Sequence, residues 1–154
     1  MGMAPTFIQI FNADYIAGKK HLFFATINAL KAFEQGRNIS NNLEMETLLY
    51  ASGQRQIEKA IKLIGFMPTS NQLAILMITS SQKEAEEAEN KIDKFIPGIR
   101  DNSVLEILKE SKADELKKIF TISKLELETM AENKSDRRTM LMWLIIEHNS
   151  LCYI

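Results

Sequence analysis

The clearest hydrophobic pattern in the chain covers residues 41–65 and predicts two amphipathic helices that meet at Ser52-Gly53. Asn41 and Glu44 have the spacing of a capping box, so we expect the first helix to begin there. In the second helix, apolar residues recur at i, i+3, i+4 and i+7, which predicts an inward face made of Ile57, Ala60, Ile61 and Ile64. Between the two helices lies the polar sequence GQRQ. The free N–H groups at the start of a helix make such a corner able to receive a phosphate.

Two strands and one long helix are predicted around this central stretch. Residues 6–11 are β-branched and aromatic, and residues 73–79 form a continuous apolar run of strand length that we expect to be buried on both faces. Residues 19–35 read as a helix that Gly36 ends in a left-handed cap. Its predicted inward residues are Leu22, Phe23, Ile27, Leu30 and Phe33.

The rest of the chain is predicted to be mainly helical. Ser81 with Glu84, and Ser123 with Glu126, have capping-box spacing and each predict a helix start. The first of these two helices has a narrow apolar stripe made of Ala85, Ala88, Ile92 and Phe95. Shorter helices are expected at residues 104–109 and 114–120, and a final helix from a cap at Ser135 or Asp136 to about His148. Residues 65–68 or 96–100 could supply a further strand.

These elements together predict the fold class and the domain organisation. We expect an α+β protein, a helix-rich single domain over residues 6–154, with a small and mostly antiparallel sheet packed by helices. Residues 1–5 show no pattern and are expected to be disordered or foreign to the natural chain. An apolar content of 45% in 154 residues is enough for a core of substantial size.

Charge and cysteine content limit the function further. The formal net charge is −1, so any contact with nucleic acid must use a local basic patch. The single cysteine, Cys152, cannot form an internal disulfide. No apolar run approaches the ~20 residues that span a bilayer, and there is no secretory signal pattern, so we expect a soluble, cytoplasmic protein without a membrane partner.

Few residues in the sequence could support catalysis. His21 and His148 are the two histidines and belong to different predicted elements, while no glycine-rich phosphate loop follows a strand. We therefore expect no enzyme activity, no metal site and no cofactor. The strongest candidates for phosphate contact are Arg55 and Lys59, which lie at i and i+4 and can point to one solvent-exposed patch.

Two of the polar features also have a simple structural interpretation. Ser52-Gly53 could be an interhelix turn without a ligand, and His21, beside Lys19 and Lys20, could simply be part of a surface helix start. The alternative for His21 is a basic rim on an RNA-binding groove. Tyr50, which comes just before the break, is either a packing residue or a platform for base stacking.

Two long segments, AGKKHLFFATINALKAFEQGRNIS and LLYASGQRQIEKAI, resemble a known family in their order and separation. They are similar to the small tRNA-binding accessory subunit of the archaeal and eukaryotic KEOPS (EKC) complex, the family of the human PRPK-binding protein. The resemblance implies a non-catalytic subunit that docks on a small atypical kinase and, through it, on the threonylcarbamoyl-transferring catalytic subunit. It also implies that the subunit holds the CCA end of tRNA while an adenosine beside the anticodon is modified. The RNA-binding residues implied are Ser52, Gly53, Gln54, Arg55, Gln56, Lys59 and His21.

The C-terminal helix contains seven consecutive apolar residues, 140–146. A helix that is apolar all round is either buried or shared between the core and another surface. We expect Trp143 and Ile146 to face inward, and an outward stripe to dock the kinase as the resemblance implies; its members are Leu141, Leu144, Ile145 and His148. The alternatives are a wholly internal helix and, for the whole protein, a protein–protein adaptor or kinase-regulatory subunit without direct RNA binding.

Overall fold

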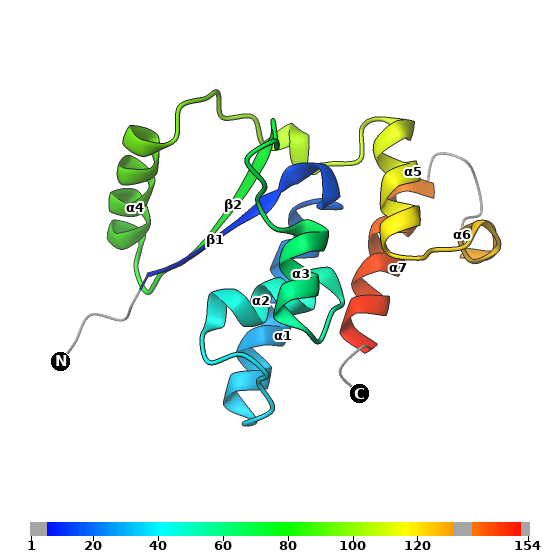
Figure 1. Cartoon of the computed structure of the whole chain (residues 1–154), viewed down its shortest axis with the longest axis horizontal. Helices are drawn as coiled ribbons and strands as arrows, with labels where there is room; N and C mark the ends of the chain where they lie inside the picture. The colour runs from blue at the N-terminus through cyan, green and yellow to red at the C-terminus, as the bar shows by residue number, and fades with distance from the viewer. Residues whose placement is uncertain (1–5, 131–136, 152–154) are drawn as a thin grey trace.

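The computed structural model describes residues 6–130 and 137–151 (Figure 1). The described strands are β1 (Phe7–Asn12) and β2 (Leu73–Ile78), and the 3-10 helices are η1 (Ala13–Tyr15) and η2 (Asn102–Leu105). The α-helices are α1 (Lys19–Glu34), α2 (Leu43–Ser52), α3 (Ile57–Ile64), α4 (Gln82–Phe95), α5 (Glu110–Ile119), α6 (Lys124–Met130) and α7 (Arg137–Leu151). The predicted helix-rich α+β fold with a small antiparallel sheet is confirmed. The predictions for residues 1–5 and for the cap at Ser135 or Asp136 lie outside the described residues.

The two strands pair antiparallel along their full length, from Phe7 opposite Ile78 to Asn12 opposite Leu73. A further strand is not found at residues 65–68 or 96–100; Gly65 makes only an isolated bridge to Phe11. The prediction that β2 is buried on both faces is wrong, since five of its six residues are partly exposed. The core covers one face of the sheet only, so the side chains of β2 on the other face keep part of their exposure.

The two faces of the sheet differ in their environment. Directly paired residues share a face, and the face that contains Phe7 and Phe11 packs into or against the core. The opposite face, which we call the outer sheet face, carries five apolar side chains that belong neither to the core nor to its margin: Ile8, Ile10, Leu73, Ile75 and Met77. Outside the core, α4 contacts β2 (Figure 1).

The face that helix α1 turns inward overlaps the predicted one only in part: Leu22 is buried and Phe33 packs against the core as expected. Phe23 and Leu30 are 58% and 42% exposed, while the buried side is formed by small residues, Ala25, Ala29 and Ala32. The helix packs against both α2 and α7, and alanines allow the helix backbones to approach closely. Spacing alone favoured the larger apolar residues because it contains no information about how near the neighbouring helices lie.

Helix α7 is an internal helix along most of its length. It contacts α1, α2, α5 and α6. Leu141, Leu144 and Ile145 are buried, so the predicted outward docking stripe is wrong. Ile146 is buried as expected, and Trp143 is half-buried against Phe24, with ring centroids 5.6 Å apart. Helices α1, α2, α5 and α6 cover α7 on several sides, including the side that the sequence pattern had assigned to an exposed docking surface.

His148 is the one member of that stripe that keeps partial exposure, and its Nε2 lies 3.1 Å from Glu126 Oε1. The pair joins α7 to α6. Glu126 is also part of the predicted capping box, which is confirmed: its carboxylate accepts the Ser123 N–H at 2.8 Å and its own N–H donates to Ser123 Oγ at 3.1 Å. The hydrogen bonds that Ser123 donates to the carboxylate, from its backbone first, hold the pKa of the Glu126 carboxyl below its ordinary value. His148 thus connects two helices through its contact with Glu126 and is not part of an exposed apolar surface.

The other helix boundaries mostly follow their local signals. Gly36 has φ 64°, as the predicted left-handed cap requires. The cap of α2 is one residue later than predicted, because Asn42 rather than Asn41 accepts the Met45 N–H. Ser81 caps α4, while Glu84 accepts from Ser80 instead of closing the box with Ser81. Among the described helices, none has the length and apolar character needed to cross a bilayer.

Candidate nucleic-acid interface

The break between α2 and α3 is the C-terminal turn of α2. Gly53 adopts the left-handed conformation, with φ 66° and ψ 21°. Ser52 Oγ donates to the Leu49 carbonyl at 3.0 Å and accepts the Gln54 N–H at 3.2 Å. Ser52 is buried, and the two hydrogen bonds of its hydroxyl group help to end the helix. The predicted break is confirmed, but Ser52 does not present its side chain to a ligand.

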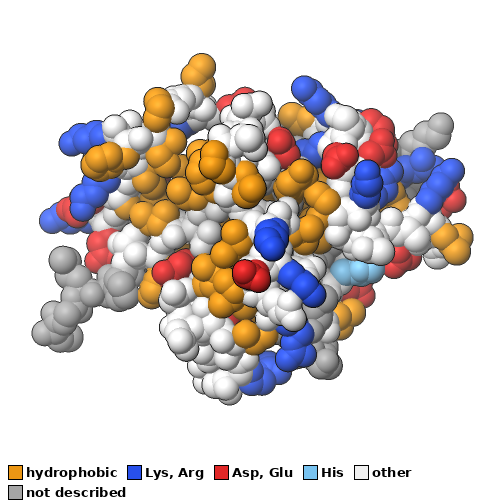
Figure 2. Space-filling model, in the orientation of Figure 1, with side chains coloured by type: hydrophobic (Ala, Val, Ile, Leu, Met, Phe, Trp, Pro, Cys, Tyr) orange, Lys and Arg blue, Asp and Glu red, His pale blue; other side chains and the backbone are white. Residues whose placement is uncertain are grey.

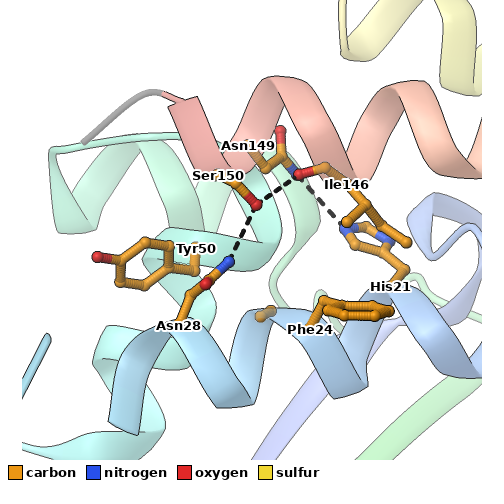
Figure 3. Close-up of a pocket in the computed structure, with 8 residues that line it drawn as sticks. His21, Phe24, Asn28, Tyr50, Ile146, Asn149 and Ser150 are labelled. Carbon is orange, nitrogen blue, oxygen red and sulfur yellow. Dashed lines mark hydrogen bonds between the residues drawn. The ribbon is translucent and has the colours of Figure 1, made fainter. Parts of the chain in front are cut away.

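Below the turn, three helices meet around one carbonyl group, that of Ala51. Figure 3 shows two of the side chains involved, His21 and Asn149, close to each other. Asn149 of α7 donates its Nδ2–H to this carbonyl at 2.8 Å, and His21 Nε2 of α1 lies at the same distance from it. A Cβ on Gly53 would lie 2.5 Å from Asn149 Oδ1. We call His21, Ala51, Gly53 and Asn149 the buried junction. Glycine is required at its centre both by the backbone conformation and by the close approach of α7.

His21 is a neutral, structural histidine. Its Nδ1 accepts the Ala17 N–H at 3.0 Å, so its Nε2 carries the proton and donates to Ala51. Burial lowers the pKa of the imidazole from 6.5 to about 4. The prediction of a basic rim at His21 is wrong, because the ring is buried and uncharged at neutral pH.

The small cavity beside the junction is too small to be a ligand site. It has a volume of about 10 Å³ and is lined in part by Phe24, Asn28 and Tyr50 (Figure 3). That is close to the lower limit for a single water molecule. Tyr50 itself is buried, which removes it as an exposed stacking platform. The inner side of the corner between α2 and α3 is therefore filled by packed side chains and does not form a binding pocket.

The outer side of the same corner is open and cationic. Arg55, Lys59 and Lys62 are exposed, and within the described ranges none of the three forms an ion pair. Figure 2 shows Lys and Arg side chains gathered over α3. We call these three residues the cationic face. Lys62 was not among the predicted RNA-binding residues; its position three residues after Lys59 was the available signal.

The start of α3 adds hydrogen-bond donors to this face. Gln56 is the N-cap of the helix, is exposed, and makes no side-chain cap hydrogen bond. The N–H groups of the first turn are consequently not satisfied by a capping side chain. Gln54 is half-exposed and also takes part in contacts within the protein. Of the seven predicted RNA-binding residues, Arg55, Gln56 and Lys59 share the surface, while Ser52 and His21 lie in the interior.

The inward face predicted for α3 is only half correct. Ala60 and Ile64 are buried, but Ile57 and Ile61 are 38% and 40% exposed. The helix packs mainly on α2, so one narrow side is enough to hold it. The two isoleucines lie beside the cationic face and give this surface an apolar component. Elsewhere in the described residues, no group of three or more His, Cys, Asp or Glu side chains could hold a metal ion.

Comparison with known proteins places the chain in a family. A family model described as "Kinase binding protein CGI-121" matches residues 3–148. "Regulatory protein Cgi121" of Methanocaldococcus jannaschii is 40% identical over 114 residues, which are 74% of this chain and 70% of the relative. "KEOPS complex subunit Cgi121" of Pyrococcus abyssi is 45% identical over 56 residues, 35% of this chain and 33% of that protein. The resemblance in the sequence is confirmed, and the chain belongs to the CGI-121 family.

Proposed function

We propose that this protein is a non-catalytic, cytoplasmic subunit of a KEOPS complex that binds the CCA end of tRNA and docks on the small atypical kinase. In this role it supports threonylcarbamoyl modification of the tRNA adenosine beside the anticodon. The name of the Pyrococcus abyssi relative supports membership of the complex, and the description of the family supports the kinase as a partner. Both histidines have structural roles, in the buried junction and in the pair with Glu126, which agrees with a subunit that binds rather than catalyses.

The cationic face is the observation that carries the RNA part of the proposal. Three exposed cations lie on or beside one eight-residue helix, against a single carboxylate, Glu58, on the same exposed surface. The whole chain has a net charge of −1, so this face is a local excess of positive charge. Local patches of this kind bind phosphates through electrostatic attraction and counterion release.

The chemistry of a single-stranded tail suits the other groups on this surface. Its unpaired bases expose flat apolar faces and hydrogen-bonding edges. The exposed side chains of Ile57 and Ile61 offer apolar contact, while the Gln56 amide and the uncapped helix start offer polar contact. With no exposed aromatic platform at Tyr50, binding by this face should depend on charge and hydrogen bonds more than on stacking.

Filter binding of intact tRNA beside the same tRNA without its CCA tail tests the proposal. We expect weaker binding of the shortened tRNA over a range of salt concentrations. Equal affinity for both would show that the acceptor tail is not the recognised element. The alternative, an adaptor without RNA contact, would then be favoured if intact tRNA also binds no better than an unrelated RNA of the same length.

Because the predicted docking stripe on α7 is buried, the outer sheet face becomes the candidate surface for docking on the kinase. Its apolar side chains are partly exposed and unpacked by the core, and Figure 2 shows hydrophobic side chains gathered over the sheet between α4 and α3. Exposed apolar patches in soluble proteins commonly mark protein interfaces. Ile8→Glu should therefore abolish kinase binding while leaving the melting temperature and tRNA binding unchanged. Leu125→Glu, at an exposed site on α6, is the matched control; equal effects of both changes would place docking elsewhere.

A further inference from the structure

The sheet has an open edge along β2, to which the proposed function assigns no role. The two described strands pair with each other, so β1 lies along one edge of β2 and no described strand lies along the other. The outer edge of β1 is closed at one end by the bridge between Phe11 and Gly65. The open edge of this sheet is therefore that of β2.

Strand β2 lacks the features with which proteins usually protect an edge strand. Charged side chains, proline and bulges are the common means of preventing a further strand from pairing there. The sequence of β2, LAILMI, contains no charge and no proline, and its pairing with β1 runs without a bulge from Leu73 to Ile78. Five of its six side chains are partly exposed. An edge of this kind is a template for another strand.

The hydrogen bonds of the sheet show which residues of β2 face the open edge. The Ala13 N–H donates to the Gln72 carbonyl at 3.0 Å, and these two residues continue the register of the strands, so they form a hydrogen-bonded pair. Such pairs alternate with non-hydrogen-bonded ones in an antiparallel sheet. The backbone N–H and C=O groups of Leu73, Ile75 and Met77 therefore point away from β1. No other backbone segment of the described chain bonds to them.

A second copy of β2 matches this row of backbone groups. When the two copies of Ile75 lie opposite each other on a twofold axis, Leu73 of each copy lies opposite Met77 of the other. All of these pairs join residues with outward-pointing groups, so each pair can exchange two hydrogen bonds. The three side chains then share one face of a continuous sheet, next to apolar side chains of the other copy.

We propose that this protein forms a symmetric dimer in which two β2 strands pair antiparallel around Ile75. A twofold interface requires a surface that is complementary to itself, and an uncharged row of groups spaced evenly about one residue meets this requirement. Water bonds to these groups in the monomer, so each new hydrogen bond adds little net stability and the dimer is weak. The inference goes beyond the proposed function, because it concerns the backbone edge of the sheet and neither the cationic face nor kinase docking.

Sedimentation equilibrium of the full chain tests the association. Over protein concentrations from about 10 µM to about 1 mM, the range in which weak dimers form, the average mass should rise from 17.6 kDa toward twice that value. Ile75→Lys places two like charges opposite each other and should raise the dissociation constant of the dimer by about tenfold or more. Ile8→Lys is the matched control, because it adds the same charge to the same face but on β1, and it should leave the dimer intact.

Hydrogen exchange locates the interface in the unmodified protein, so this test does not depend on the folding of a variant. The amide hydrogens of Leu73, Ile75 and Met77 should exchange about tenfold more slowly once about 90% of the chains are paired, because only the unpaired fraction exchanges freely. Those of Ala74 and Leu76 point to β1 and should be protected at low and high concentration alike. NMR of the ¹⁵N-labelled chain at two concentrations measures this alternation.

Four results would overturn the proposal. The first is the mass of a single chain at every concentration, and the second is an equal loss of association in Ile75→Lys and Ile8→Lys. The third is a dimer without alternating protection in β2, which would place the interface elsewhere on the chain. The fourth is protection of Leu73, Ile75 and Met77 only after the kinase subunit is added, which would assign this edge to a strand of the kinase.

Discussion

Two adjacent parts of residues 52–56 have opposite environments, although they form one continuous polar sequence. Ser52 and Gly53 are packed at the buried junction, where α1, α2 and α7 share the Ala51 carbonyl. Arg55 and Gln56 lie on the surface, where the cationic face begins. The chain passes from interior to solvent in two residues.

The difference shows why one polar motif cannot be assigned a single role. Polar groups in the interior are costly unless they are hydrogen-bonded, and those of the junction are satisfied within the protein. The cations of the cationic face are paired with no carboxylate among the described residues, so they remain available to a ligand. Changes in the junction should therefore alter stability, and changes on the cationic face should alter RNA binding.

The largest expected effect on stability is that of Gly53→Ala. A left-handed backbone costs a non-glycine residue about 1–2 kcal/mol. The new methyl group would also displace Asn149 and weaken its hydrogen bond to Ala51, which adds about 1–3 kcal/mol. We expect the free energy of unfolding, measured with urea, to fall by about 2–5 kcal/mol.

Gly36→Ala is the matched control for this prediction. Gly36 has nearly the same φ, 64°, but a Cβ there would meet nothing within 4 Å. It should lose only the backbone contribution of about 1–2 kcal/mol. If both substitutions cost the same, the contact between Gly53 and α7 contributes nothing, and the junction is not the tight meeting point described above.

A smaller effect should appear in the pH dependence of stability. The pKa of His21 is about 4 in the folded protein and 6.5 for an exposed histidine. As pH falls below 6.5, the unfolded chain takes up the proton first, so the free energy of unfolding decreases between pH 6.5 and pH 4. The total loss from this group is about 3 kcal/mol.

Comparison of the wild type with His21→Gln isolates this contribution. Carboxylates such as Glu126, whose pKa is lowered, also reduce stability in acid, but they are present in both proteins. The unfolding free energy of the wild type should therefore fall more steeply than that of the variant from pH 7 to pH 4. Parallel curves would mean that His21 accepts its proton in the fold without a penalty.

Sequence signals that act over one or two helix turns predicted the elements well. The break at Ser52-Gly53, the cap at Gly36 and the capping box at Ser123 all appear in the structure, since each depends on local backbone geometry. Which side of a helix faces inward depends on distant neighbours. Phe23 on α1 and Leu144 on α7 were assigned to the wrong sides because the number and closeness of packed helices cannot be read from spacing.

The same limit applies to the candidate site. Arg55 and Lys59 were predicted to share an exposed patch, and both are exposed, because an i,i+4 pair on one short helix needs only local information. The position of His21 beside two lysines suggested a surface residue. Its actual partners, Ala51 and Asn149, are 30 and 128 positions away in the sequence, beyond the reach of any local pattern.

The cationic face offers the sharpest contrast with the junction, through reversal of two charges. Arg55→Glu combined with Lys59→Glu should leave the melting temperature unchanged, since both side chains are exposed, and should weaken tRNA binding by about tenfold or more at low salt. Repulsion adds to the loss of two contacts, and each lost contact should flatten the salt slope by roughly 0.7. Filter binding over a salt series measures both quantities, with Lys83→Glu combined with Lys91→Glu on α4 as the control of equal charge. A folded double variant that keeps the affinity and the salt slope of the wild type would show that RNA binds elsewhere. A fall in melting temperature would instead mean that the buried junction and the cationic face form a single structural unit, and that the division between them is wrong.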